Sequence, residues 1–238
     1  MLWEILKAGR TNNSEDLFTR LAARRVSVSK RGYIVLPHDT GAFNATAKGN
    51  NIIWEYNGER IQGNTCSFNV LRDNGTIRLA FDEALERLEI KNNNALKADL
   101  SDLGGKITNA LSLYNCTKIT GDLADLGGKI TYFLSLYNCQ NITGDLADLG
   151  GKITYFLRLD KCPNISGVYS GTAYPTTINL SYTGVSAEEM DQNLINLNEN
   201  TSKKGTFTAS GMSRTAASDA AVAGLISKGW TITGLTKV

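Results

Sequence analysis

Few side chains in this sequence have the types and spacing that catalysis requires. Its single histidine, His38, is followed directly by Asp39, and an imidazole beside a carboxylate can act as a general base. No Gly-x-Ser-x-Gly motif or other nucleophile motif accompanies this pair, so we interpret His38 as a loop residue. No catalytic residue is predicted, and we expect a binding protein rather than an enzyme.

Three cysteines recur at an interval of 23 residues, at Cys116, Cys139 and Cys162. Free cysteine is among the most buried residue types, which favours a structural role in a core. Cysteines on neighbouring strands, about 4.8 Å apart, are also close enough for a disulfide. Three equivalent positions cannot all pair, however, and no Cys-x-x-Cys motif is present. The sequence therefore predicts no metal site and no cofactor.

Two other repeated motifs contain residue types that bind ligands. Gly104-Gly105 and its later copies lack the spacing of a phosphate-binding loop, so they predict tight turns. Asp122 and Asp125, which recur 23 residues later, form a carboxylate row that could hold calcium. The alternating glycine and aspartate of repeat-type calcium sites is missing, so we interpret the row as structural.

The elements that position these residues must come from a chain of 238 residues, 42% of them hydrophobic, enough for one large domain or two smaller ones. Twenty-five Lys and Arg against 23 Asp and Glu leave a net charge near +2, so nucleic acid is not an expected partner. No apolar run approaches the roughly 18 residues of a membrane helix, so no membrane insertion is expected. Residues 1–10 lack the pattern of a secretion signal, although removal of a signal peptide would leave the same sequence.

Three nearly identical segments follow one another every 23 residues, beginning at Ser101, Ala124 and Ala147. A repeat of this length predicts stacked supersecondary units, none of which can bury its apolar face alone. Each segment contains the pattern L-x-L-x-x-C-x-x-I, which resembles the leucine-rich repeat, and residues 88–96 supply a related copy upstream. The resemblance implies a parallel sheet whose outward face is the usual partner-binding surface.

The repeats lead us to expect a solenoid over residues 85–238. The 23-residue repeats occupy 101–167, and further strands with two amphipathic helices and a cap are predicted over 168–238. A capping box at Ser186 marks the start of the first of these helices.

Alternation in the segment Leu111-Ser112-Leu113-Tyr114 places the leucines inward and the other two residues outward. The outward face also carries Glu89 and Lys91 of the upstream copy. Exposed, stacked tyrosines at positions 114 and 137 are side chains of the kind that anchor protein or sugar contacts. The predicted ligand-binding residues are Ser112, Tyr114, Asn115, Ser135, Tyr137, Asn138, Arg158, Asp160 and Lys161.

Residues 26–84 show short alternating runs separated by the hairpin signals Asn57-Gly58 and Asn74-Gly75. The run IIWEYNGERIQGNTCSFNVLRDNGTIRLAF is similar in spacing to the polycystic-kidney-disease type of immunoglobulin-like domain, which implies a small β-sandwich. Residues 1–25 precede it as an anchor segment, in which an amphipathic stretch either docks on another protein or packs back on its own β domain. The apolar side of this stretch consists of Leu17, Phe18 and Leu21.

Together these features predict an α+β multidomain chain, a small antiparallel β-sandwich followed by a leucine-rich repeat solenoid with a parallel β-sheet. The repeats and the C-terminal segment resemble leucine-rich proteins of gut Bacteroidetes and of the bacteriophages that infect them. This resemblance implies a virion component, a fibre or decoration protein that recognises a protein or cell-surface glycan and docks on other virion proteins through residues 1–25. The alternatives are a secreted cell-surface adhesin and an intracellular protein-binding scaffold, and homo-oligomers would suit a fibre.

Overall fold

The structure is a computed structural model that describes residues 31–238. Long antiparallel strands form its first part. β2, which is as long as β5, pairs antiparallel with β3, β4 and β5, and β1 also pairs with β5. Asn57 and Gly58 both have positive φ angles, 48° and 84°, so the predicted tight turn joins β2 to β3. These strands are β1 (Arg31–His38), β2 (Gly41–Tyr56), β3 (Glu59–Gln62), β4 (Thr65–Val70) and β5 (Gly75–Ile90).

The repeats form the middle of the structure, where each copy contributes one short strand to a parallel ladder. β6, β8 and β10 pair in parallel in that order, and the strands on the far side of the repeats form a second sheet in the order β11-β9-β7. The elements are α3 (Leu100–Leu103), β6 (Ile107–Ser112), β7 (Thr120–Asp122), η1 (Leu123–Leu126), β8 (Phe133–Ser135), β9 (Asn141–Asp145), η2 (Leu146–Leu149), β10 (Phe156–Arg158) and β11 (Ile165–Ser166).

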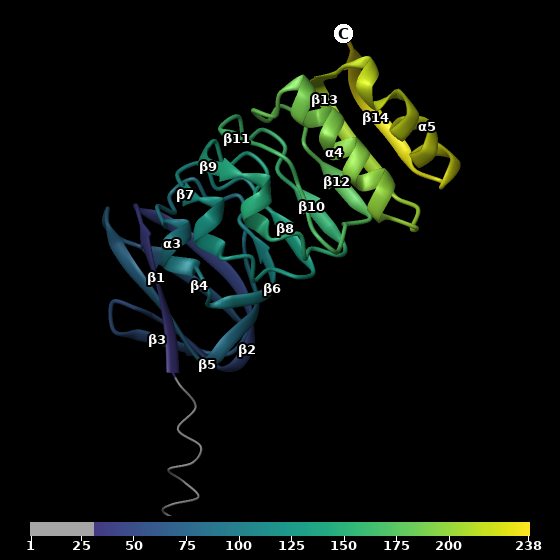
Figure 1. Cartoon of the computed structure of the whole chain (residues 1–238). Coiled ribbons are helices and arrows are strands. Elements are labelled where there is room, and N and C mark those ends of the chain that lie inside the picture. Colours follow the sequence, from purple (N-terminus) through teal and green to yellow (C-terminus); the bar gives the residue numbers. More distant parts are fainter. Residues whose placement is uncertain (1–30) are drawn as a thin grey trace, which may run out of the picture. The chain divides into compact units, whose positions relative to one another are not determined.

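Two helices accompany the last three strands. Ser186 and Glu189 form the predicted capping box, in which the serine hydroxyl accepts from the Glu189 amide and the glutamate accepts from the Ser186 amide. α4 packs against β13 and α5, and α5 packs against β14 (Figure 1). The elements are β12 (Thr177–Asn179), α4 (Ala187–Asn200), β13 (Thr206–Arg214), η3 (Ala216–Ser218), α5 (Asp219–Ser227) and β14 (Thr231–Lys237).

The predicted fold class is wrong, because one mixed sheet continues through both predicted parts. The main sheet has 11 strands: its order runs β14-β13-β12-β10-β8-β6-β5-β2-β3, and β1 and β4 pair with β5 and β2 beside this path (Figure 1). Strands hold 45% of the described residues and helices 18%. The structure is therefore mostly β, without a separate antiparallel sandwich followed by a separate parallel solenoid.

β5 explains this difference. Its N-terminal half pairs antiparallel with β2, and its C-terminal half pairs both with β2 and, in parallel, with β6. Between Arg78 and Ile90 the sequence has no Gly, Pro or Asn that would end a strand. The last strand of the expected β domain and the first rung of the expected solenoid are consequently one strand, and the expected boundary after residue 84 falls inside it. Glu83, with a φ angle of 64°, marks an irregularity within the strand.

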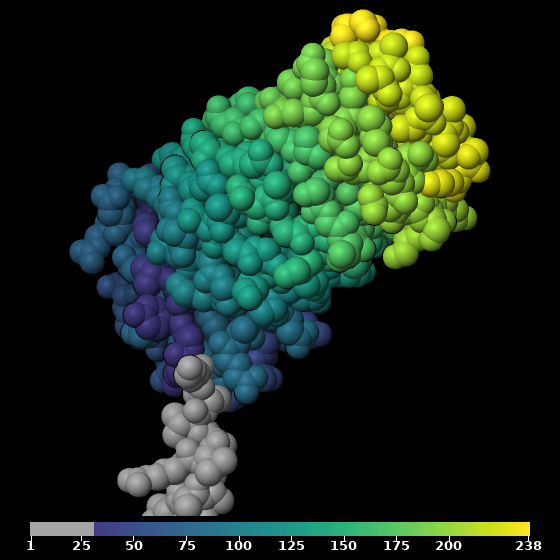
Figure 2. All heavy atoms as spheres, viewed as in Figure 1, coloured from purple at the N-terminus to yellow at the C-terminus, as the bar shows by residue number. Residues whose placement is uncertain are grey.

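A single hydrophobic core follows this continuous sheet. Buried Trp54, Phe43 and Phe81 fill its N-terminal part, and Leu111, with its equivalents in the other repeats, continues it. The colours in the space-filling view change gradually along the described residues, so segments close in the sequence lie close in space (Figure 2). No helix in residues 31–238 has the length and hydropathy needed to cross a bilayer.

The cysteines are buried and free, as predicted for a structural role. The Cys139 thiol donates to the Leu113 carbonyl at 3.0 Å, and the Cys162 thiol donates to the Leu136 carbonyl at 2.9 Å. Each thiol thus satisfies a backbone acceptor of the preceding repeat. Burial raises the pKa of Cys162 to about 12, which makes its thiolate a poor candidate for metal binding or nucleophilic chemistry.

Candidate functional site

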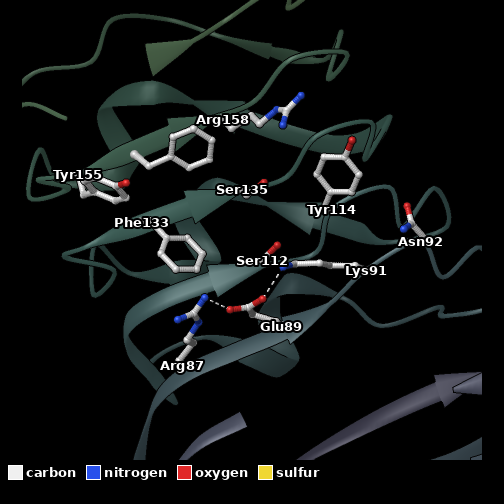
Figure 3. A pocket seen from close by; sticks show the side chains of 11 residues that line it. Arg87, Glu89, Lys91, Asn92, Ser112, Tyr114, Phe133, Ser135, Tyr155 and Arg158 are labelled. Carbon is white, nitrogen blue, oxygen red and sulfur yellow. Dashed lines mark ion pairs between the residues drawn. The ribbon is translucent and has the colours of Figure 1, made fainter. Parts of the chain in front are cut away.

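A groove with a volume of about 470 Å³ lies on the strand face where β5, β6, β8 and β10 run side by side (Figure 3). Strand register brings its residues together. Glu89, Ser112, Ser135 and Arg158 are direct partners across the four strands, and Phe133 and Phe156 pair in a second row. The lining consists of Arg87, Glu89, Lys91, Asn92, Ser112, Tyr114, Phe133, Ser135, Tyr155, Phe156 and Arg158.

Small side chains create the hollow. Ser112 and Ser135 form its floor, with Tyr114 and Arg158 on one side and Phe133 and Tyr155 on the other (Figure 3). Both serines point outward, as the alternation predicts, although the larger neighbours leave them largely buried. Neither hydroxyl has a hydrogen-bond partner within residues 31–238, so both are available to a ligand that enters the groove.

Of the two predicted tyrosines, Tyr114 lines the first wall, and Tyr137 supports it from outside the lining. The rings of Tyr114 and Tyr137 stack with centroids 4.5 Å apart and planes 23° from parallel. The Arg158 guanidinium carbon lies 5.1 Å from the Tyr114 centroid and 4.7 Å from the Tyr137 centroid. Lys161 donates to the Tyr137 hydroxyl at 3.2 Å and lies 5.4 Å from its ring. Stacking and cation–π contacts hold the wall in a fixed orientation.

The second wall was not among the predicted site residues. The Arg87 guanidinium carbon lies 4.9 Å from the Phe133 centroid, and Tyr155 stacks on Tyr132 at 4.9 Å with the planes 9° apart. Extending the alternation of Leu134 and Leu136 back by one residue, however, places Phe133 on the outward face. The same step from Leu88 reaches Arg87.

Cations lie above carboxylates at both ends of the groove. The Glu89 side chain is 13% exposed and pairs with Lys91 at 2.6 Å and with Arg87. These two cations are more exposed, the Lys91 side chain to 53% and the Arg87 side chain to 44%. Asp160 is 9% exposed and accepts from Nε of Arg158 at 2.8 Å, whereas Arg158 is 31% exposed. Burial is the largest single effect on the pKa of Arg158 and lowers it, but the hydrogen bond to Asp160, the charge of Asp160 and the nearby tyrosines together outweigh burial, so the net shift is upward.

Two of the predicted ligand residues, Asn115 and Asn138, take part in a ladder of amides beside the groove. Both have a φ angle of 57°, a left-handed conformation that asparagine tolerates better than most residues. Asn138 donates to Asn115 at 2.7 Å, and Asn115 donates to Asn92 at 3.1 Å. These amides support the turns that follow the strands, and of the three only Asn92 lines the groove. Lys161 takes the equivalent left-handed position, with a φ angle of 63°.

The other motifs are explained by local structure. His38 is fully buried and its Nε2 lies 3.0 Å from Oδ1 of Asn93, which also accepts from two backbone amides. Asp122 and Asp145 cap the short helices η1 and η2 in capping boxes. Over residues 31–238 no group of three or more histidine, cysteine or acidic side chains is placed to hold a metal ion. Leu17, Phe18 and Leu21, the predicted docking residues, lie outside the described residues.

Comparison with protein-family models, with curated proteins and with solved structures found no match to this chain.

Proposed function

We propose that this chain is a non-enzymatic binding protein whose groove recognises a glycan on a surface. The observation that carries the proposal is the stacked pair Tyr114 and Tyr137 beside a floor of two unpartnered serine hydroxyls. The faces of aromatic rings pack well against the apolar faces of sugar rings, whereas hydroxyl and guanidinium groups exchange hydrogen bonds with sugar hydroxyls. The volume lies within the range of small-ligand sites, about 300–1,000 Å³.

A protein ligand would use the same tyrosine and arginine types as anchors. The recessed floor favours the glycan, because a flat protein surface would leave the hydroxyls of Ser112 and Ser135 without partners. Burial of unpaired polar groups is costly, whereas sugar hydroxyls that enter the groove can both donate to them and accept from them.

The proposed place of action is the surface of a bacteriophage particle. Its support is the likeness of the repeats and the C-terminal segment to leucine-rich proteins of gut Bacteroidetes and their phages. Immunogold labelling tests it directly: label on particles supports the proposal, label on the bacterial envelope supports the adhesin, and label in the cytosol supports the scaffold.

Glycan binding is tested with the double variant Tyr114→Ala/Tyr137→Ala on an oligosaccharide array. Because anchor residues of this kind contribute about 2 kcal/mol or more, we expect affinity to fall at least about tenfold. Tyr33→Ala is the matched control, since Tyr33 is an exposed tyrosine on β1 that also lies under an arginine, outside the groove. If the array retains the double variant as well as the parent protein, the glycan site does not lie on this face.

A further inference from the structure

We infer that the ligand of the groove carries negative charge, as an acidic sugar with a carboxylate group; this inference rests on the proposed function. The groove and its rim hold four cations, two beside β5 and two beside β10, against only two carboxylates. The cations are Arg87, Lys91, Arg158 and Lys161, and the carboxylates are Glu89 and Asp160.

The depth of these charges matters as much as their number. The Glu89 and Asp160 side chains are buried to about the same extent, whereas their partners Lys91 and Arg158 are more exposed to solvent. Glu89 lines the groove already paired with Lys91 and Arg87, and Asp160 lies outside the lining, so a ligand there meets an excess of positive charge. The two excess positive charges stand in a partly desolvated hollow, where an opposite charge is attracted more strongly than in bulk water.

Arg158 is the group best oriented for a carboxylate. Asp160 engages Nε at 2.8 Å and Nη2 at 3.5 Å, so one edge of the guanidinium is taken and the N–H groups of Nη1 are left for a ligand. The tyrosine pair beneath the guanidinium fixes its plane, and a planar fork of donors held in place matches a planar carboxylate. A sugar ring on this aromatic wall would carry its acid group next to Arg158.

The experiment uses the full-length chain on an array that pairs acidic oligosaccharides, such as oligogalacturonate, with their carboxyl-reduced counterparts. We expect the acidic member of a pair to bind at least about tenfold more tightly at low salt, because hydrogen bonds to charged groups exceed neutral ones. The advantage should shrink as salt screens the exposed cations.

Two variants locate the effect. Lys91→Gln removes one positive charge and leaves Glu89 paired with Arg87. The double variant Arg158→Gln/Asp160→Asn keeps the net charge and removes the guanidinium donors without leaving a buried carboxylate unpaired. Each should lower the preference for acidic over reduced ligands severalfold. Arg78→Gln is the matched control, since Arg78 lies outside the groove, 4.8 Å from the Tyr33 centroid. This variant should prefer acidic over reduced ligands as strongly as the parent protein does.

The outcomes separate the two proposals. Equal binding of acidic and reduced ligands, with loss of both in the tyrosine double variant, would overturn the inference and leave glycan recognition standing. A preference for acidic ligands that survives both groove variants would overturn it as well. Retention of no oligosaccharide at all would overturn the proposed function together with this inference.

Discussion

At the scale of single residues, most of the conspicuous polar groups stabilise the fold. Asp39 is the clearest example, because it pairs with Lys97 at 2.5 Å and with Lys118 at 2.8 Å. Its neighbour His38 is buried against Asn93. The two adjacent residues that most resembled a catalytic pair in the sequence therefore join β1 to the first repeats.

The two lysines make stability depend on pH. Hydrogen bonds from Lys118 and Lys97 lower the pKa of Asp39 from 3.8 to about 2. The folded state thus binds this proton less readily than the unfolded chain, so the stabilisation is complete above pH 3.8 and is lost as the pH falls toward 2. Urea titrations should show that the parent has a higher free energy of unfolding than Asp39→Asn, and that this difference becomes smaller as the pH falls from 3.8 toward 2. A gap that stays constant would contradict the assignment.

At the scale of elements, the turns after the repeat strands depend on residues that tolerate a left-handed backbone. Asn92, Asn115, Asn138 and Lys161 all take this conformation, one in each successive copy. The asparagine amides also bond to one another, so the turns are coupled along the stack.

Substitution at Asn138 separates these two contributions. Asn138→Gly keeps the left-handed conformation and loses only the amide contacts, whereas Asn138→Ala also forces a Cβ into that conformation. We expect the alanine variant to be about 1 kcal/mol less stable than the glycine variant in urea denaturation. Equal stabilities would mean that the turn relaxes to another conformation.

The short elements were largely predictable, and their joining was not. The 23-residue period identified the buried leucines and the outward tyrosines, because alternation and repetition are local properties of the sequence. The second wall of the groove followed the same alternation but began one residue earlier, at Phe133. The continuity of β5 was not predictable, because the segments before and after residue 84 each resemble a complete unit. It results from pairing with β2 along the strand and with β6 at its C-terminal end.

At the scale of the whole molecule, β5 couples the antiparallel strands to the repeats. It pairs with β1 and β2 of the antiparallel part and with β6 of the repeats, so neither part can lose β5 without disrupting the other. Residues 32–238 accordingly form one unit by their internal contacts.

This coupling predicts one cooperative unfolding transition for residues 31–238. Cys66 on β4 and Cys162 in the third repeat are both buried, and burial raises the pKa of each to about 12. Pulses of a thiol-alkylating reagent at increasing urea concentration should label both at the same midpoint, as peptide mass spectrometry can measure. Labelling of Cys162 at clearly lower urea than Cys66 would show that the repeats unfold independently.

The in-register repeats also have a consequence for how this surface can diversify. Because each copy adds one strand in the same register, a duplication or deletion of 23 residues by recombination between the near-identical segments would change the groove by one strand spacing, about 4.8 Å. Both ends of the sheet would keep their neighbours. The number of copies therefore sets the length of the groove, so changes in copy number can adjust the length of ligand it accommodates while the fold stays the same.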